Sequence, residues 1–199
     1  MKKGTNWGLV GIIAGVIIVG MFYFSTVSSL TKADNKVEKL ESNFKLQIER
    51  RYELIPNLVN TVKGYANHEE EVFTQIAEAR SKLGTVIENN GTLQEYDEAN
   101  SALPDITASF LKIAENYPKL ESDKMFVSLM DQLEGTQNRI TVAKEDYNDA
   151  VEDYNNKVSI PPSSWIAGMR GFEEKDYLEV DENKMENPTV DFSDIGQNK

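Results

Sequence analysis

The chain has no cysteine and only one histidine among its 199 residues. Without cysteine it can form no disulfide, carry no lipid on an N-terminal cysteine and use no thiol nucleophile. A single histidine is too few for the HExxH zinc motif and for the paired Glu-x-x-His motifs of di-iron bundles. The sequence also contains no glycine-rich motif of the kind that binds phosphates or dinucleotides. We therefore predict that the protein has no cofactor and is not an enzyme.

Basic residues are scarce beside acidic ones, with 21 Lys and Arg against 33 Asp and Glu and a formal net charge of −12. Half of that charge lies in residues 173–199, which hold nine acidic and three basic residues. An acidic surface repels nucleic acid and anionic lipid, so no nucleic-acid partner is predicted. Residues 176–199 have few apolar side chains besides their charge, and we predict that they form a disordered tail.

One long uncharged run of 28 residues, Gly4 to Thr31, opens the chain. A helix of about 20 apolar residues crosses the hydrocarbon layer of a bilayer. Trp7 and Tyr23 stand near the two ends of the apolar centre, where amphipathic rings prefer the interface. We predict that residues 1–30 form a single-pass anchor in the cell membrane, with residues 7–27 in contact with lipid. A cleavable signal peptide is the alternative, but the run is longer than a usual signal core and no convincing cleavage site follows.

The orientation of the anchor is less clearly marked, because Lys2 and Lys3 precede the run while Lys32 and Lys36 follow it. A short basic start directly before an apolar core resembles a signal anchor, so we expect the body on the extracytoplasmic side. Glycines spaced four apart within residues 4–15 would let two anchors approach closely, which permits a homo-oligomer.

Residues 31–160 contain four segments with helical period and none with sustained alternation. We predict an all-α fold: the N-terminal transmembrane helix, then an antiparallel four-helix bundle with long, coiled-coil-like helices. Pro56 is expected to kink or break the first segment near Leu54, and Gly64 to end it. Asn67 is expected to cap the second. Pro104 is expected to kink the third segment or to start a new helix.

The fourth segment has the most regular pattern. Its apolar positions recur every seven residues, which predicts coiled-coil-like packing against neighbouring helices. Ile160-Pro161-Pro162 ends it after about 57 Å of helix. In an up-down order this helix returns toward the membrane. The positions of the repeat are Phe126, Leu133, Ile140, Tyr147 and Tyr154.

Short stretches along nearly the whole body share their residues with one known family. They include Arg50-Arg51-Tyr52-Glu53-Leu54-Ile55-Pro56-Asn57-Leu58-Val59, Val62-Lys63-Gly64-Tyr65-Ala66, Ala79-Arg80, Tyr117-Pro118, Asn138-Arg139-Ile140, Tyr147-Asn148, Tyr154-Asn155, Gly171-Phe172 and Val190-Asp191-Phe192. On these stretches the chain resembles the LemA family. The resemblance implies a bacterial single-pass membrane protein with a helical-bundle body, and it implies no particular biochemical activity.

Two adjacent arginines, Arg50 and Arg51, interrupt an apolar helix face. We interpret them as ion-paired with acids of the fourth segment, their stems lying on apolar surface. In a buried pair, replacing either arginine by alanine would cost about 3–5 kcal/mol. The alternative is a site for an anionic ligand or a partner near Pro56. The candidate network comprises Arg50, Arg51, Tyr52, Pro56, Asn57, Arg80, Asn138, Arg139 and Asn148.

Residues 161–175 are predicted to form a short amphipathic segment. Trp165, Ile166, Met169 and Phe172 would share one apolar face on a short helix. That face either closes the open end of the bundle or rests at the membrane, and Trp165 and Phe172 are the candidate interface residues.

These patterns favour a membrane-anchored, non-enzymatic interaction or scaffold protein that binds unknown protein partners. The alternative function is a ligand-binding protein or an enzyme that uses Arg50, Arg51, Asn138 and Arg139 around an anion.

Overall fold

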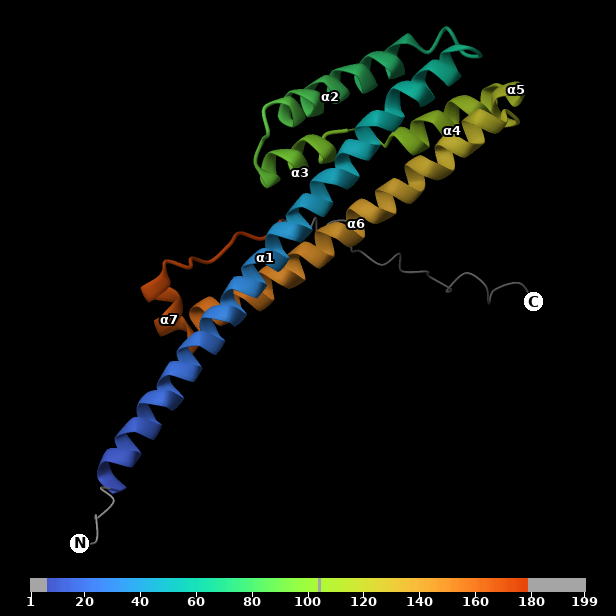
Figure 1. Cartoon of the computed structure of the whole chain (residues 1–199). Coiled ribbons are helices and arrows are strands. Elements are labelled where there is room, and N and C mark those ends of the chain that lie inside the picture. Colours follow the sequence, from blue (N-terminus) through green and yellow to red (C-terminus); the bar gives the residue numbers. More distant parts are fainter. Residues whose placement is uncertain (1–6, 104, 179–199) are drawn as a thin grey trace, which may run out of the picture.

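The computed structural model of the chain describes residues 7–103 and 105–178 (Figure 1). Within these residues the chain is helical and has no β-strand, so the predicted all-α class is confirmed. The elements are α1 (Trp7–Lys63), α2 (Glu70–Glu88), α3 (Leu93–Ser101), α4 (Ile106–Asn116), α5 (Pro118–Glu121), α6 (Lys124–Ser159) and α7 (Ser163–Arg170).

α1 is one continuous helix of 57 residues that joins the apolar run to the body. At 1.5 Å per residue it is about 85 Å long. Every residue from Trp7 to Val19 is exposed, and Figure 1 shows this part of α1 extending alone beyond the other helices. The helix is long and apolar enough at this end to cross a membrane.

Of the kink or break predicted at Pro56, the break is not found, because α1 continues through Pro56 to Lys63; it ends before Gly64 as expected. Proline removes one backbone donor from a helix and crowds the preceding turn. On either side of Pro56, Ile55 and Leu58 are fully buried in the main core. Their packing holds the helix where the local sequence alone would interrupt it.

α6 runs antiparallel to α1 along most of the body (Figure 1). All five positions of its seven-residue repeat are buried, none more than 4% exposed. Its acidic residues from Glu145 to Asp153 lie on the exposed face. The helix ends at Ser159, before the proline pair, and returns the chain to the part of α1 that follows the apolar run.

α2 to α5 pack against the far half of this helix pair, α2 and α3 on α1 and α4 and α5 on α6. The predicted cap at Asn67 is wrong: α2 begins at Glu70, and its N-terminal cap, Glu69, makes no side-chain hydrogen bond. The buried Ala66, whose N–H donates to the Val62 carbonyl, fixes the preceding turn instead. α3 has a complete capping box, in which Thr92 and Glu95 each bond the other's backbone N–H.

The third predicted segment is divided as the proline suggested. α3 ends at Ser101 and α4 begins at Ile106, with the Asp105 carboxylate accepting from the Ala108 N–H as its cap. α4 ends before Tyr117-Pro118, also as predicted. The one-turn helix α5 that follows was not predicted, because four residues give no periodicity to detect.

The C-terminal part returns to α6. α7 packs beside α1 through a small apolar cluster of Leu30, Ile166 and Ala167, separate from the main core. After Gly171, whose φ of 74° ends α7 in the left-handed region, residues 172–178 run extended along the helices. The predicted tail begins at 176, but Leu178 is 2% exposed. Its remaining residues, 179–199, lie outside the described residues.

Candidate functional site

The predicted network surrounds the line along which α1 and α6 meet, but it is divided between two sides of that line. We call the side that carries α3, α4 and residues 172–178 the covered side, and the opposite side the open side. Arg51 and Asn148 lie on the covered side, where they contact those elements. Arg50, Asn57 and Arg139 line one depression on the open side. The four groups proposed to surround one anion therefore do not converge.

Arg51 is the most buried charged side chain in the described part of the chain, at 7% exposure. Its Nη1 donates to the side-chain oxygen of Asn100 at 2.8 Å and to the Asn100 carbonyl at 3.4 Å. Its Nε has no partner among the described residues. Burial lowers the pKa of the Arg51 guanidinium, and the nearby Asp105 carboxylate opposes that shift.

A cavity of about 230 Å³ adjoins this arginine. Polar groups from α3, α4 and α6 meet there. Its lining comprises Arg51, Asn100, Ser101, Leu103, Asp105, Thr107, Leu133 and Gln137. The size fits a small ligand, and the guanidinium is the group that would hold an anion.

The open side carries a groove made of two adjoining depressions, of about 250 and 350 Å³, that share Arg139. The first includes Arg50 and Asn57, and the second includes Asn138 and the half-exposed Val142. The Arg139 Nη2 donates to the Thr136 hydroxyl at 2.8 Å. The groove follows α1 from Asn43 to Asn57, a rise of about 21 Å.

Gln47 lies at the floor of this groove and is 6% exposed. Its Nε2 donates to the Asn43 side-chain oxygen at 3.2 Å, while its own Oε1 has no partner among the described residues. A buried amide oxygen without a donor costs about 1–3 kcal/mol. The sequence did not single out Gln47, since a glutamine at a core-facing helix position gives no chemical signal by itself.

The predicted ion pairs between the arginines and α6 are not found. The described residues contain four ion pairs, and each is made by a lysine: Lys36–Asp153, Lys45–Glu41, Lys144–Asp97 and Lys175–Asp34. Lys144, which interrupts the apolar pattern of α6, is the most enclosed of these, with a 2.8 Å bond that joins α6 to α3.

Tyr52 and Arg80 form a structural contact between α1 and α2. The Arg80 guanidinium stacks 4.0 Å from the centre of the Tyr52 ring, and its Nε donates to the Tyr52 carbonyl at 3.5 Å. A Cβ on Gly84 would lie 3.0 Å from the Tyr52 hydroxyl, so the absence of a side chain at Gly84 makes room for the ring. This contact holds α2 in place rather than forming part of a site.

Asn148 and Asn155 hold the extended segment by its backbone. The side-chain amide of Asn148 donates to the Leu178 carbonyl and accepts from the Leu178 N–H, both at 2.9 Å. Asn155 makes the same pair of bonds with Lys175, again at 2.9 Å. Seven residues of helix and three residues of extended chain both span about 10 Å, so the two spacings match. In the sequence, the only signal of this attachment is the seven-residue interval between the two asparagines, each of which directly follows Tyr147 or Tyr154.

Tyr147 completes the attachment, because its hydroxyl donates to the Asp176 carbonyl at 3.1 Å. Burial raises the pKa of Tyr147 to about 12, and the Glu41 and Asp176 carboxylates contribute. Lys175 joins the segment to α1 through its ion pair with Asp34.

The predicted apolar face around α7 is divided. Ile166 is buried against Leu30, and Phe172 is half-buried against both apolar clusters. Trp165 and Met169 point away from these contacts and are 69% and 72% exposed. Ile166 and Phe172 thus pack against the body, whereas Trp165 and Met169 stay uncovered.

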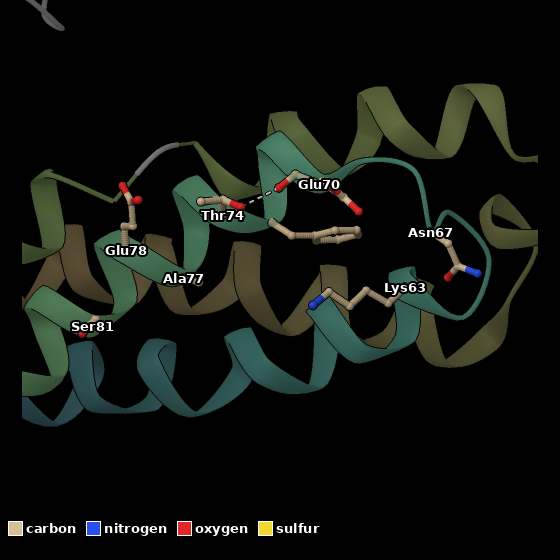
Figure 2. Close-up of a pocket in the computed structure, with 8 residues that line it drawn as sticks. Lys63, Asn67, Glu70, Thr74, Ala77, Glu78 and Ser81 are labelled. Carbon is tan, nitrogen blue, oxygen red and sulfur yellow. Dashed lines mark hydrogen bonds between the residues drawn. The ribbon is translucent and has the colours of Figure 1, made fainter.

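A larger groove, of about 630 Å³, lies between α2 and the end of α1 and contains none of the predicted site residues (Figure 2). The Lys63 ammonium lies 5.1 Å from the centre of the Phe73 ring, and the Thr74 hydroxyl donates to the Glu70 carbonyl at 2.8 Å. Across residues 7–103 and 105–178, no group of three or more His, Cys, Asp or Glu is placed to hold a metal.

The similarity of this chain to known proteins extends over most of its length. The sequence profile of the LemA family matches residues 40–192. Magnetosome protein MamQ 2 of Paramagnetospirillum magneticum is 23% identical over 195 residues, covering 86% of this chain and 70% of its own. Protein LemA of Metamycoplasma hominis is 22% identical over 151 residues, covering 74% and 67%. Magnetosome protein MamQ of Magnetospirillum gryphiswaldense is 22% identical over 192 residues, covering 85% and 69%.

Proposed function

The chain belongs to the LemA family, and on that premise we propose that it is a membrane-anchored, non-enzymatic interaction protein. Its binding surface is the open-side groove between α1 and α6. The partner is an amphipathic protein helix that inserts an apolar stripe between Leu46 and Val142. The body is a four-segment up-down bundle in which α3 to α5 make up the third segment.

The observation that carries this proposal is the uncovered groove itself, which has the exposed Val142 in one depression and Arg50 and Arg139 in the other. The Gln47 oxygen beneath the groove is enclosed and has no donor among the described residues, although desolvated amide oxygens normally accept a hydrogen bond. Val142 in the groove is 54% exposed, and Leu46, one helical turn from Arg50 on α1, is 44% exposed. Arg50 and Arg139 provide donors for carboxylates on a partner. Exposed apolar side chains with basic edges are typical of a surface for association rather than for catalysis.

A photo-crosslinking residue placed in the groove tests the proposal. At position 142 in the full chain, in its own membrane, we expect capture of a discrete protein, and the same at position 46. Leu111 on α4 is similarly exposed, at 51%, and is the matched control. The proposal is wrong if positions 111 and 142 capture the same proteins with the same yield.

A second change separates specific capture from chance contact. Arg139 is exposed and makes no ion pair among the described residues, so Arg139→Glu should leave the fold intact. It should also abolish capture at position 142 by repelling an acidic partner. If the captured protein is a second copy of the chain, the groove is a homo-oligomer interface.

The membrane placement is part of the same proposal: the first part of α1 spans the cell membrane and the body stands on its extracytoplasmic side. The natural chain has no cysteine, so a Ser81→Cys change on exposed α2 gives a single label. We expect a membrane-impermeant maleimide to modify it in intact cells. Labelling only after lysis would place the body on the cytoplasmic side.

A small anion held by Arg51 is the second candidate function, favoured by the unpartnered Nε beside its 230 Å³ cavity. A bound ligand raises stability by mass action. Phosphate, sulfate or acetate should then raise the melting temperature of the natural chain but not of Arg51→Gln, with Arg50→Gln as the control that keeps the response. An equal response of all three chains would exclude the site.

A further inference from the structure

α7 lies beside the end of the apolar run rather than beside the body alone. Its buried residues Ile166 and Ala167 pack on Leu30, and Tyr23 and Val27 of α1 border the same cluster. Figure 1 shows α7 next to α1 just where the isolated part of that helix begins. The short helix therefore contacts a part of α1 that belongs to the uncharged run.

The length of that run places the contact at a defined depth. The run is helical from Trp7 to Thr31, and these 25 residues span about 37 Å, a little less than the roughly 40–45 Å of a bilayer with its headgroups. The hydrocarbon core takes about 20 of these residues, which leaves the last few at each end in the headgroup layer. Val27 and Leu30 are among those last residues. α7, which packs on them, then lies at the same level.

The face of α7 that turns away from α1 has the composition of an interfacial helix. Trp165 and Met169 are four residues apart and among the most exposed large apolar side chains outside the uncharged run. Ile160, 55% exposed at the start of the turn into α7, adds to the same end of the molecule. Arg170 in the last turn can reach lipid phosphates. Tryptophan is the side chain most favoured at this depth.

We propose that α7 lies in the headgroup layer of the bilayer, with Trp165 and Met169 inserted toward the acyl chains. The proposal rests on the membrane span proposed above. In it, Ile166 and Ala167 connect the interfacial helix to α1, so that lipid holds the body at two places instead of one. A single span would let the body tilt freely, whereas a second contact beside it fixes how the α1–α6 pair stands on the membrane.

Depth-dependent quenching of Trp165 tests this proposal. The chain has two tryptophans, so Trp7→Phe leaves Trp165 as the only indole in the full chain. In phosphatidylcholine vesicles with brominated acyl chains, we expect bromines near the headgroups to remove most of the Trp165 emission and deep bromines to remove less. Aqueous acrylamide should have little effect. Strong acrylamide quenching without bromolipid quenching would overturn the proposal.

Two further chains keep the outcomes separate. Trp165→Phe leaves Trp7, whose quenching by bromolipid reports insertion of the span itself. If Trp7 is not quenched, the proposed span fails; if Trp7 is quenched and Trp165 is not, only the role of α7 fails. Met125→Trp in a chain without the natural tryptophans puts an indole on a 62% exposed site at the far end of α6, where acrylamide alone should quench it.

Ile166→Gln provides a last check on the connection through α7. It breaks the contact with Leu30 but leaves Trp165 and Met169 unchanged. If α7 binds lipid through its own exposed face, Trp165 should remain quenched by bromolipid in this variant. Loss of that quenching would mean that Trp165 is only carried near the membrane by its neighbours, and the proposed insertion would be wrong.

Discussion

The two sides of the α1–α6 pair differ in how their polar groups are satisfied. On the covered side, side chains at the edge of the helix pair bond to the backbone of what covers them: Asn148 to Leu178, Asn155 to Lys175 and Tyr147 to Asp176. On the open side, the Gln47 oxygen is buried without a partner, and Arg139 bonds only within its own helix. The same pair of helices thus has one side completed by its own chain and one side that is not.

This difference explains why adjacent arginines have different surroundings. Residues 50 and 51 are about 100° apart around α1, enough to place them on opposite sides of the contact with α6. Arg51 turns toward α3 and α4 and is buried, while Arg50 turns toward the groove and stays exposed. A shared position in sequence therefore does not give them a shared role.

The largest effect is expected from removing Arg51. In Arg51→Ala the Asn100 oxygen is left buried without its donor and the stem leaves a space, which we expect to cost about 2 kcal/mol of unfolding free energy. Arg50→Ala should cost less than about 0.5 kcal/mol. Urea unfolding of the full chain in detergent measures both. Equal losses would contradict the separation of the two sides.

Arg51→Met refines this comparison. The methionine fills most of the space of the arginine stem without a charge, so it should recover the packing part of the loss. A loss in Arg51→Met as large as in Arg51→Ala would assign the whole effect to the hydrogen bond with Asn100. The 3–5 kcal/mol that a buried ion pair would give does not apply, because the partner of Arg51 is an amide.

A smaller effect is expected from Asn148→Ala, about 1–2 kcal/mol, since two hydrogen bonds to Leu178 are lost together. The segment can detach and return these groups to water, which limits the loss. Hydrogen exchange at the Leu178 N–H should become much faster. Asn138→Ala on the open side is the control and should change neither stability nor exchange at Leu178; faster exchange in it would show that the segment is not held locally.

The sequence predicted the helices well because their signals are repetitive. The seven-residue repeat of α6, the proline at the break between α3 and α4 and the uncharged run each leave a pattern along several residues. What the sequence could not show is which side of α1 each arginine faces, because that depends on the rotation of the helix against α6. Nor could it show that a segment with acids and few apolar residues is held by its backbone, since asparagine–backbone bonds do not depend on the sequence of the segment.

The pH dependence of the unfolding free energy tests how Tyr147 holds residues 172–178, and its effect should be smaller. The pKa of Tyr147 is about 12 in the fold against 10.0 when free, so the fold favours the neutral phenol. That contribution is complete below about pH 10 and is lost as the pH rises toward about 12. Tyr147→Phe cannot ionise, so its unfolding free energy should fall less over this range than that of the natural chain. Parallel decreases would show that Tyr147 is not the group responsible.

The smallest effect should have the opposite sign. Gln47→Leu replaces a buried amide with an unpartnered oxygen by an apolar side chain of similar size, and we expect a gain of about 0.5–1 kcal/mol. Gln137→Leu, an exposed position on α6, is the control and should change stability little. Because the Gln47 oxygen is enclosed, the more stable chain should keep its crosslinking from position 142. A loss of stability in Gln47→Leu would mean that the oxygen is already satisfied in the free protein.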